Sequence, residues 1–217
     1  MELNRKRYND LDTYYKKKYG KKIIKLPLDG GFTCPNRDGT ISRMGCIYCS
    51  DAGAGEWTYR SAGDIKEQIA YQKKILSKPD RAEGYIAYFQ NFTNTYGDLG
   101  KMRQMFYAAI DEPDILGLSI ATRADCLPYE VLNLLEELNE NTDLTIELGM
   151  QSVNDNTLKF INRGYSHQEF DNGVQKLCSL GIEMVAHIIV GLVGEDIDDY
   201  LSCLLYTSDA ADDSLRV

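Results

Sequence analysis

The sequence predicts an α/β fold in which parallel strands form a sheet or barrel with helices on the outside. Short apolar runs alternate with stretches of helical periodicity along most of the chain, which is the pattern of repeated strand-helix units. Polar residues follow directly after the ends of several apolar runs. The 217 residues and the 43% hydrophobic content fit one sizeable globular domain.

Five strands and six helical segments follow from this pattern. We expect strands over residues 23–28, 85–90, 116–121, 144–150 and 183–190, each a short run rich in apolar side chains. Helices are expected from about residue 61 or 64, over 99–110, from about 128, over 156–161 and 167–180, and from about 195. Asp64 and Glu67 have capping-box spacing at the first of these helices. Cys178 shares helical spacing with Phe170 and Leu177, which indicates a core thiol.

Polar side chains collect where the predicted strands end. In a parallel barrel the carboxyl ends of the strands share one face, and that face carries the active site. The residues concerned are the cysteines of the first loop, Asn91, Thr93 and Asn94 after the second strand, Arg123 and Asp125 after the third, and Gln151 and Ser152 after the fourth.

Cys34, Cys46 and Cys49 supply three thiolates in one short stretch without a visible fourth ligand. The two histidines, His167 and His187, lie far downstream. A closed structural zinc site takes four ligands, whereas a [4Fe–4S] cluster held by three thiolates keeps one iron open for a ligand. A zinc ribbon that lacks one ligand, or three unconnected loop cysteines, remain the alternatives.

The charge of the chain is unevenly distributed. The net charge is −9, but residues 1–25 hold nine Lys or Arg against three acids, which makes this arm +6 and the remainder −15. With Tyr8, Tyr14, Tyr15 and Tyr19, the arm is suited to bind phosphates and stack on bases. A solvated surface helix explains the same composition equally well.

The amino terminus is charged and no run of signal-peptide length follows it. No stretch approaches the roughly 18 apolar residues of a membrane span. We therefore expect a cytoplasmic protein without membrane contact, in which six cysteines serve metal binding better than disulfides.

Residues 46–49, with an aromatic directly before the last cysteine, resemble the cluster loop of radical S-adenosylmethionine (SAM) enzymes. Eleven residues separate Cys34 from Cys46, and this wider spacing resembles the elongator-catalytic-subunit-like branch and, within it, the YhcC-like family. The resemblance extends over about residues 5–202. It is carried further by the stretches 31–39, 88–96, 147–152 and 161–164.

This resemblance implies a partial TIM-type (β/α)6 barrel whose sixth strand and carboxyl-terminal region are missing. It implies two cofactors, a [4Fe–4S] cluster on the three cysteines and SAM on the open iron. By position, Tyr48 would lie against the adenine, Gln151 and His187 would reach the ribose, and Arg163 would reach the carboxylate. Ser152 is a further residue expected to bind SAM. The residues expected at the aminocarboxylate end are Asn91, Thr93 and Asn94. Arg163 as an exposed helix-end charge, and His187 as a satisfied core histidine, are the alternatives.

The resemblance also divides the chain. We expect a basic arm over residues 1–22, an incomplete radical SAM core over 23–202, and a tail over 203–217 that resembles translated adapter sequence. The implied activity is cleavage of SAM to a 5′-deoxyadenosyl radical, with tRNA wobble-uridine modification as the favoured substrate class. A flavodoxin or ferredoxin would donate the electron. Radical modification of a protein or small metabolite, and a zinc-binding interaction module, are the alternatives. Cys126, beside Asp125, is a candidate substrate-side thiol.

Overall fold

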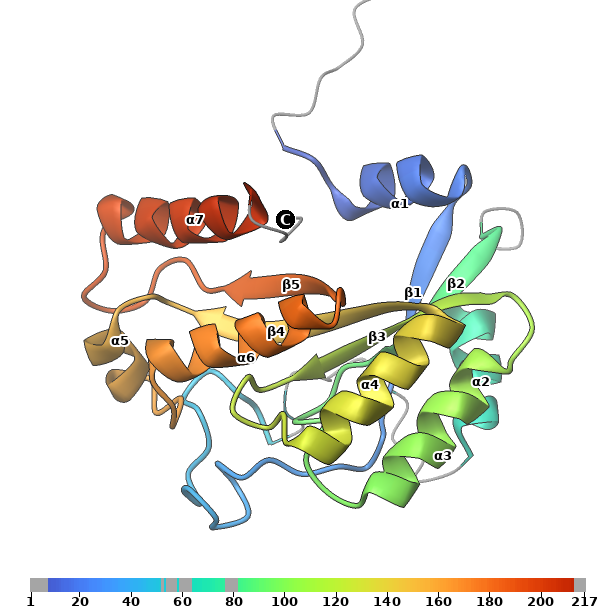
Figure 1. The fold of residues 1–217 in the computed structure, drawn as a ribbon, viewed down its shortest axis with the longest axis horizontal. Helices are drawn as coiled ribbons and strands as arrows, with labels where there is room; N and C mark the ends of the chain where they lie inside the picture. Colours follow the sequence, from blue (N-terminus) through green and yellow to red (C-terminus); the bar gives the residue numbers. More distant parts are fainter. Residues whose placement is uncertain (1–7, 52, 54–57, 59–63, 77–81, 213–217) are drawn as a thin grey trace, which may run out of the picture.

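The computed structural model describes residues 8–51, 53, 58, 64–76 and 82–212. Strands and helices alternate along the described chain (Figure 1). In chain order the elements are α1 (Leu11–Tyr19), β1 (Ile23–Leu28), α2 (Ile65–Leu76), β2 (Gly84–Phe89), α3 (Leu99–Ile110), β3 (Ile115–Thr122), α4 (Tyr129–Asn141), β4 (Asp143–Gln151), α5 (Asp155–Phe160), α6 (His167–Ser179), β5 (Glu183–Ile188) and α7 (Ile197–Asp212).

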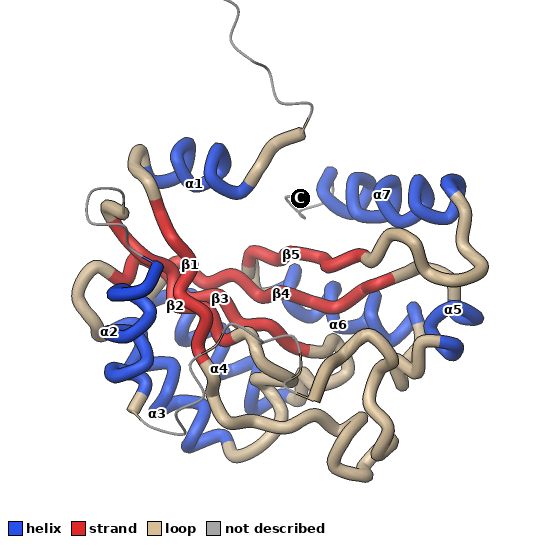
Figure 2. The backbone as a smooth tube through the Cα atoms, turned by 180° about the vertical axis from the view of Figure 1, so that it is seen from behind, coloured by secondary structure: helices blue, strands red, loops and turns tan. Residues whose placement is uncertain are grey.

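The five strands form one parallel sheet in the order β1-β2-β3-β4-β5. Helices α2, α3, α4 and α6 cover one face of this curved sheet, as the opposite views in Figures 1 and 2 show. Each strand pairs with the strand that precedes it in the chain, with a helix in between. This sequential order is that of an open, partial barrel, and it confirms the predicted α/β class.

The main core lies between the sheet and these helices. Phe89 of β2 and Phe106 of α3 are fully buried and meet edge to face with ring centroids 4.9 Å apart. Leu118 and Ile120 of β3 and Leu148 of β4 extend the same core along the sheet. Each such side chain contributes about 1.5–3 kcal/mol to the stability of the fold when it is buried away from water. The packing of the helices on the sheet therefore stabilises the strands and fixes the positions of their ends.

Helix α1 lies across the amino ends of β4 and β5. Asp10 caps the helix, and the Lys18 ammonium donates to Asp143 and to Glu183, both at 2.7 Å. The Tyr14 and Tyr19 hydroxyls donate to the same two carboxylates. The surface-helix interpretation therefore describes residues 11–19. These two tyrosines, together with the buried Tyr15, are engaged within the protein and do not form an open stacking surface.

The element bounds agree closely with those expected from the sequence. β1 and α3 match to the residue, whereas β5 ends at Ile188, two residues before the predicted end. Helix α2 begins at Ile65; of the two predicted starts, residue 61 lies outside the described residues. Helix α7 is continuous across the predicted boundary between residues 202 and 203, and Cys203 is buried. Within the described ranges, we find no helix that is long and apolar enough to cross a membrane.

Candidate functional site

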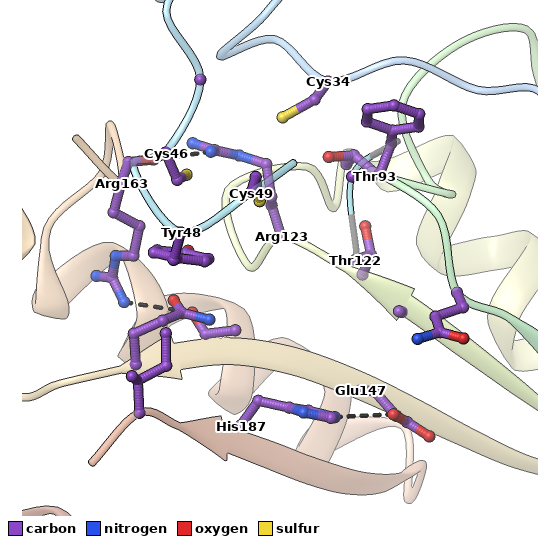
Figure 3. Close-up of a pocket in the computed structure, with 18 of the residues that line it drawn as sticks. Cys34, Cys46, Tyr48, Cys49, Thr93, Thr122, Arg123, Glu147, Arg163 and His187 are labelled. Atoms are coloured by element: carbon purple, nitrogen blue, oxygen red, sulfur yellow. Dashed lines mark hydrogen bonds and ion pairs between the residues drawn. The ribbon is translucent and has the colours of Figure 1, made fainter. Parts of the chain in front are cut away.

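A cavity of about 310 Å³ opens at the carboxyl ends of the strands (Figure 3). Its lining comes from the loop after β1, from the carboxyl-terminal halves of β2, β3, β4 and β5 with the residues that follow them, and from the segment after α5. Eight of the eleven site residues expected from the sequence line it: Cys34, Cys46, Tyr48, Cys49, Thr93, Gln151, Arg163 and His187.

The cysteine loop is fixed by two polar side chains of its own. The Arg37 guanidinium donates to the carbonyl oxygens of Cys49 and Ser50 at 3.0 and 2.6 Å. The Asn36 amide donates to the carbonyl of Asn162 at 2.6 Å and to the Cys46 sulfur at 3.4 Å. These contacts tie the loop to the segment after α5 and hold its thiols on the cavity wall.

The donor set of the loop fits an iron–sulfur cluster. Cys34, Cys46 and Cys49 are free thiols on one cavity. A hydrogen bond from Cys49 lowers the pKa of Cys46 although burial opposes the shift, so this thiol readily becomes the thiolate that a metal requires. In the part of the chain that the structure describes, no three Cys, His, Asp or Glu side chains are arranged to hold a single ion. Three thiolates in one loop match the donor set of a cluster that keeps one iron open for a ligand.

Gln151 reaches the cavity through an unusual backbone. It ends β4 with a φ of 58°, at a register shift in the pairing with β5. Its Oε1 atom is buried and finds no hydrogen-bond partner among the described residues. A buried unpaired amide oxygen costs about 1–3 kcal/mol. A bound group that donates a hydrogen bond, such as a sugar hydroxyl, would remove that cost.

Gly149 makes room for this side chain. A Cβ at position 149 would lie 2.4 Å from the Gln151 Nε2 atom, so Gly149→Ala is expected to displace the amide. SAM should then bind about three- to tenfold more weakly, the loss of one neutral hydrogen bond, by equilibrium dialysis. Gly100→Ala on α3 is the control, because Gly100, like Gly149, has no positive φ and a Cβ there would meet only the Asp98 carboxylate, at 3.2 Å. A fully retained affinity in Gly149→Ala would show that Gln151 does not bind SAM.

Arg163 is buried rather than exposed, so the helix-end alternative is wrong. Only 1% of the residue is accessible. Its guanidinium donates to the carbonyls of Met150 at 2.6 Å and Tyr165 at 3.1 Å, and lies 3.8 Å from the centroid of the Tyr165 ring. These contacts hold the segment after α5 against the end of β4. A contact with the SAM carboxylate stays a prediction.

Three of the expected residues do not line the cavity. Asn91 pairs with Thr58, and the Asn94 amide donates to the carbonyls of Phe89 and Ala121 at 3.0 and 2.9 Å. Ser152 donates to Glu195 and accepts from the backbone of Asn154. In the structure these polar side chains bind neighbouring strand ends and loops. Their roles toward SAM stay predictions.

The lining also contains residues that the sequence did not mark as ligands. Arg123, noted only as a polar strand end, binds Asp125 through two hydrogen bonds of 2.9 and 2.8 Å.

Cys126, the candidate substrate-side thiol, is buried outside the lining, and burial raises its pKa to about 12. It is therefore a poor nucleophile at neutral pH.

His187 and Glu147 form a pair on the cavity wall. The His187 Nε2 atom lies 2.8 Å from Glu147 Oε2, and the two side chains are 49% and 3% exposed. The core-histidine alternative is thus only half right, because one ring nitrogen is satisfied while much of the ring remains open to the cavity. Glu147 is not among the site residues expected from the sequence. It is the one acidic residue within its apolar predicted strand, and that position could have indicated a buried carboxylate with a functional role.

Residues 37–205 match the radical SAM superfamily, and the chain belongs to that superfamily. Membership implies a [4Fe–4S] cluster and SAM, for which the three thiols and the unpaired Gln151 oxygen provide matching groups.

Among individual proteins, the chain is 43% identical over 193 residues to YtqA of Bacillus subtilis and 37% identical over 202 residues to YhcC of Escherichia coli K12. These matches cover 89% and 93% of this chain but 60% and 64% of the relatives. The chain thus spans less than two thirds of their length.

Solved structures show the same fold at low sequence identity. The archaeal Elp3 of Methanocaldococcus infernus superimposes with a TM-score of 0.60 at 16% identity, over 85% of this chain and 42% of that one. Coproporphyrinogen III oxidase (HemN) of Escherichia coli, a radical SAM enzyme, gives 0.55 at 14% identity, over 91% and 44%. The open five-stranded sheet is therefore a partial barrel of the radical SAM type, as the sequence predicted.

Proposed function

We propose that this chain carries the cluster- and SAM-binding core of a radical SAM enzyme of the YhcC-like group. The observation that supports it best is the presence of three free thiols, Tyr48 and the unpaired Gln151 amide on one cavity at the carboxyl ends of parallel strands. When bound, a reduced [4Fe–4S] cluster supplies the electron that cleaves SAM into methionine and a 5′-deoxyadenosyl radical.

The residues of this chain would hold the cluster and orient SAM. Cys34, Cys46 and Cys49 would hold the cluster, and the Tyr48 ring, 39% exposed on the cavity wall, offers a face for the adenine. Gln151 would accept a hydrogen bond from the ribose.

SAM cleavage tests this proposal directly. The anaerobically reconstituted protein with dithionite and SAM is expected to form 5′-deoxyadenosine. Tyr48→Ala should weaken SAM binding by about 1–3 kcal/mol through lost stacking. Tyr129→Ala, at an exposed tyrosine that starts α4, is the matched control and should leave binding unchanged. Absence of 5′-deoxyadenosine from a protein with a full cluster would refute the proposal.

For the substrate we propose RNA, with the wobble uridine of a tRNA as the modified base, and a flavodoxin or ferredoxin as electron donor. The resemblance to the elongator catalytic subunit supports the RNA assignment, as does the excess of Lys and Arg in residues 1–25, of which Lys18 and Lys25 are already bound to acids elsewhere in the protein. Helix α1 lies at the amino ends of β4 and β5, away from the cavity. Its lysines would therefore add affinity for the tRNA body without positioning the base.

Salt-dependent binding separates RNA from the other substrate classes. We expect tRNA affinity to fall steeply with salt, and Lys17→Glu with Lys21→Glu to weaken it equally for all tRNA sequences. Lys18 is left intact, because it anchors α1. Lys66→Glu with Lys74→Glu on α2 is the control of equal charge. Binding that is insensitive to salt, or equal losses in both variants, would favour a protein or small metabolite as substrate.

A further inference from the structure

Four strands each contribute one polar side chain to a network beside the cavity. Glu147 of β4 is its centre, and Lys25 of β1 and Ser119 of β3 both donate to Glu147 Oε1. His187 of β5 contacts the second oxygen, Oε2, at 2.8 Å. A buried carboxylate costs several kcal/mol unless its partners compensate, so an arrangement of three partners from three strands demands a reason.

The network fixes the charge of Glu147. Burial alone would raise the pKa of this carboxyl, whereas the hydrogen bond from His187, the Lys25 charge and the Ser119 hydroxyl lower it. The Lys25 ammonium on Oε1 favours the anion whichever tautomer His187 adopts. Lys25 is held in place as well, since its ammonium lies 4.1 Å from the centroid of the Tyr88 ring. Glu147 is therefore an anion at neutral pH.

The charge of Glu147 determines the tautomer of His187. An ionised carboxylate only accepts hydrogen bonds, so the proton of the 2.8 Å contact must reside on Nε2 of the imidazole. In the neutral ring the other nitrogen, Nδ1, then carries a lone pair and no proton. His187 lines the cavity and is half-exposed, and the structure gives Nδ1 no partner among the residues it describes.

We propose that Lys25 and Glu147 are positioning residues that lock His187 as the Nε2–H tautomer, so that the cavity presents a hydrogen-bond acceptor at Nδ1. This acceptor selects a ligand group that donates a hydrogen bond, and a ribose hydroxyl of SAM is the group that the family resemblance already places at His187. The choice of ligand rests on the proposed function, whereas the tautomer does not. The unpaired Gln151 oxygen on the same cavity is a second acceptor, which suits the two hydroxyls of one ribose.

Nitrogen NMR measures the tautomer without any turnover. The chain has two histidines, so ¹⁵N-histidine labelling of the reconstituted protein gives two rings, and His167→Gln assigns them. At pH 8 we expect the Nε2–H form for His187 in the wild type. Lys25→Met leaves the buried Glu147 carboxylate without its cation, so His187, the more basic partner, should take up a second proton at Nδ1 and shift toward the imidazolium signal. Lys25→Arg keeps the cation and should restore the wild-type signal.

Glu147→Gln offers a second route, because a near-isosteric amide can donate or accept and should give a mixture of tautomers. Circular dichroism confirms that each variant is folded. An Nδ1–H ring in the wild type, or the Nε2–H form retained in both Lys25→Met and Glu147→Gln, would overturn the positioning role.

Binding of SAM and of its 2′-deoxy and 3′-deoxy analogues tests the ligand assignment. In the wild type, removing the hydroxyl that reaches Nδ1 should weaken binding about tenfold, the loss of one hydrogen bond. In Glu147→Gln the protein should bind SAM and that deoxy analogue with nearly equal affinity, because Nδ1 of His187 is no longer held as an acceptor. An equal penalty in both proteins overturns the ribose assignment. Failure to bind SAM with the expected tautomer refutes the proposed function and leaves the positioning role standing.

Discussion

Cys46→Ala is expected to abolish assembly of the [4Fe–4S] cluster. Of the three thiols, Cys46 alone is buried, and it is held by the hydrogen bond from Asn36 while its pKa is lowered by the hydrogen bond from Cys49. Two remaining thiolates leave two irons of a cubane without a protein ligand. The wild type should bind about four iron and four sulfide after anaerobic reconstitution, and the variant close to none.

Cys178→Ala provides the matched control, because Cys178 lies on α6 and packs against the core, outside the cavity lining. It should keep the full iron and sulfide content and the brown chromophore. Iron and sulfide analysis also separates a cluster from a zinc site, which would bind one metal and no sulfide. A full cluster in Cys46→Ala would show that the ligand assignment is wrong.

Arg163→Ala is expected to destabilise the fold by about 3–6 kcal/mol, because the carbonyls of Met150 and Tyr165 each lose a charge-assisted hydrogen bond of about 1.5–3 kcal/mol. The expected effect should be measured as a lower midpoint of urea unfolding with an unchanged slope. The same substitution would weaken SAM binding for a structural reason alone. A loss of SAM cleavage in this variant would therefore not by itself prove a contact with the SAM carboxylate.

Arg103→Ala is the matched control for this measurement. Arg103 forms an ion pair with Glu137 on the surface, between α3 and α4, where solvent screens the charges. Its removal should change the unfolding midpoint far less than removal of Arg163. Equal shifts in the two variants would mean that the buried guanidinium is not a structural tie.

The sequence predicted most of the fold because the signals involved are local. The bounds of β1 and α3 are marked by capping residues. Gly20 ends α1 shortly before β1 begins, and Asp98 caps the start of α3. The end of β5 was predicted two residues too late. Ile189 and Val190 continue the apolar run, but Ile188 is the last residue that pairs with β4. Strand pairing depends on a partner elsewhere in the chain, which local hydrophobicity does not reveal.

The site was predicted less completely for the same reason. The three cysteines lie within one loop and could be recognised together, whereas the partners of Glu147 lie 122 residues before it and 40 residues after it. Asn94 was expected to face SAM, yet its amide joins the ends of β2 and β3. A polar residue that follows a strand can turn toward the cavity or toward the backbone, and only the packed structure decides between them.

The anchoring of α1 also has a consequence for the order of folding. Lys18 contacts residues that lie 125 and 165 positions later in the chain, at the beginnings of β4 and β5. Although α1 precedes all five strands in the chain, its docking site does not exist until β5 has been made and has paired with β4. Contacts of such long sequence separation form late, after the loop-closure entropy of the intervening chain has been overcome. Helix α1, which precedes the sheet in the chain, is thus among the last of the described elements to find its place, and protection of its amides from exchange would report that β4 and β5 have paired.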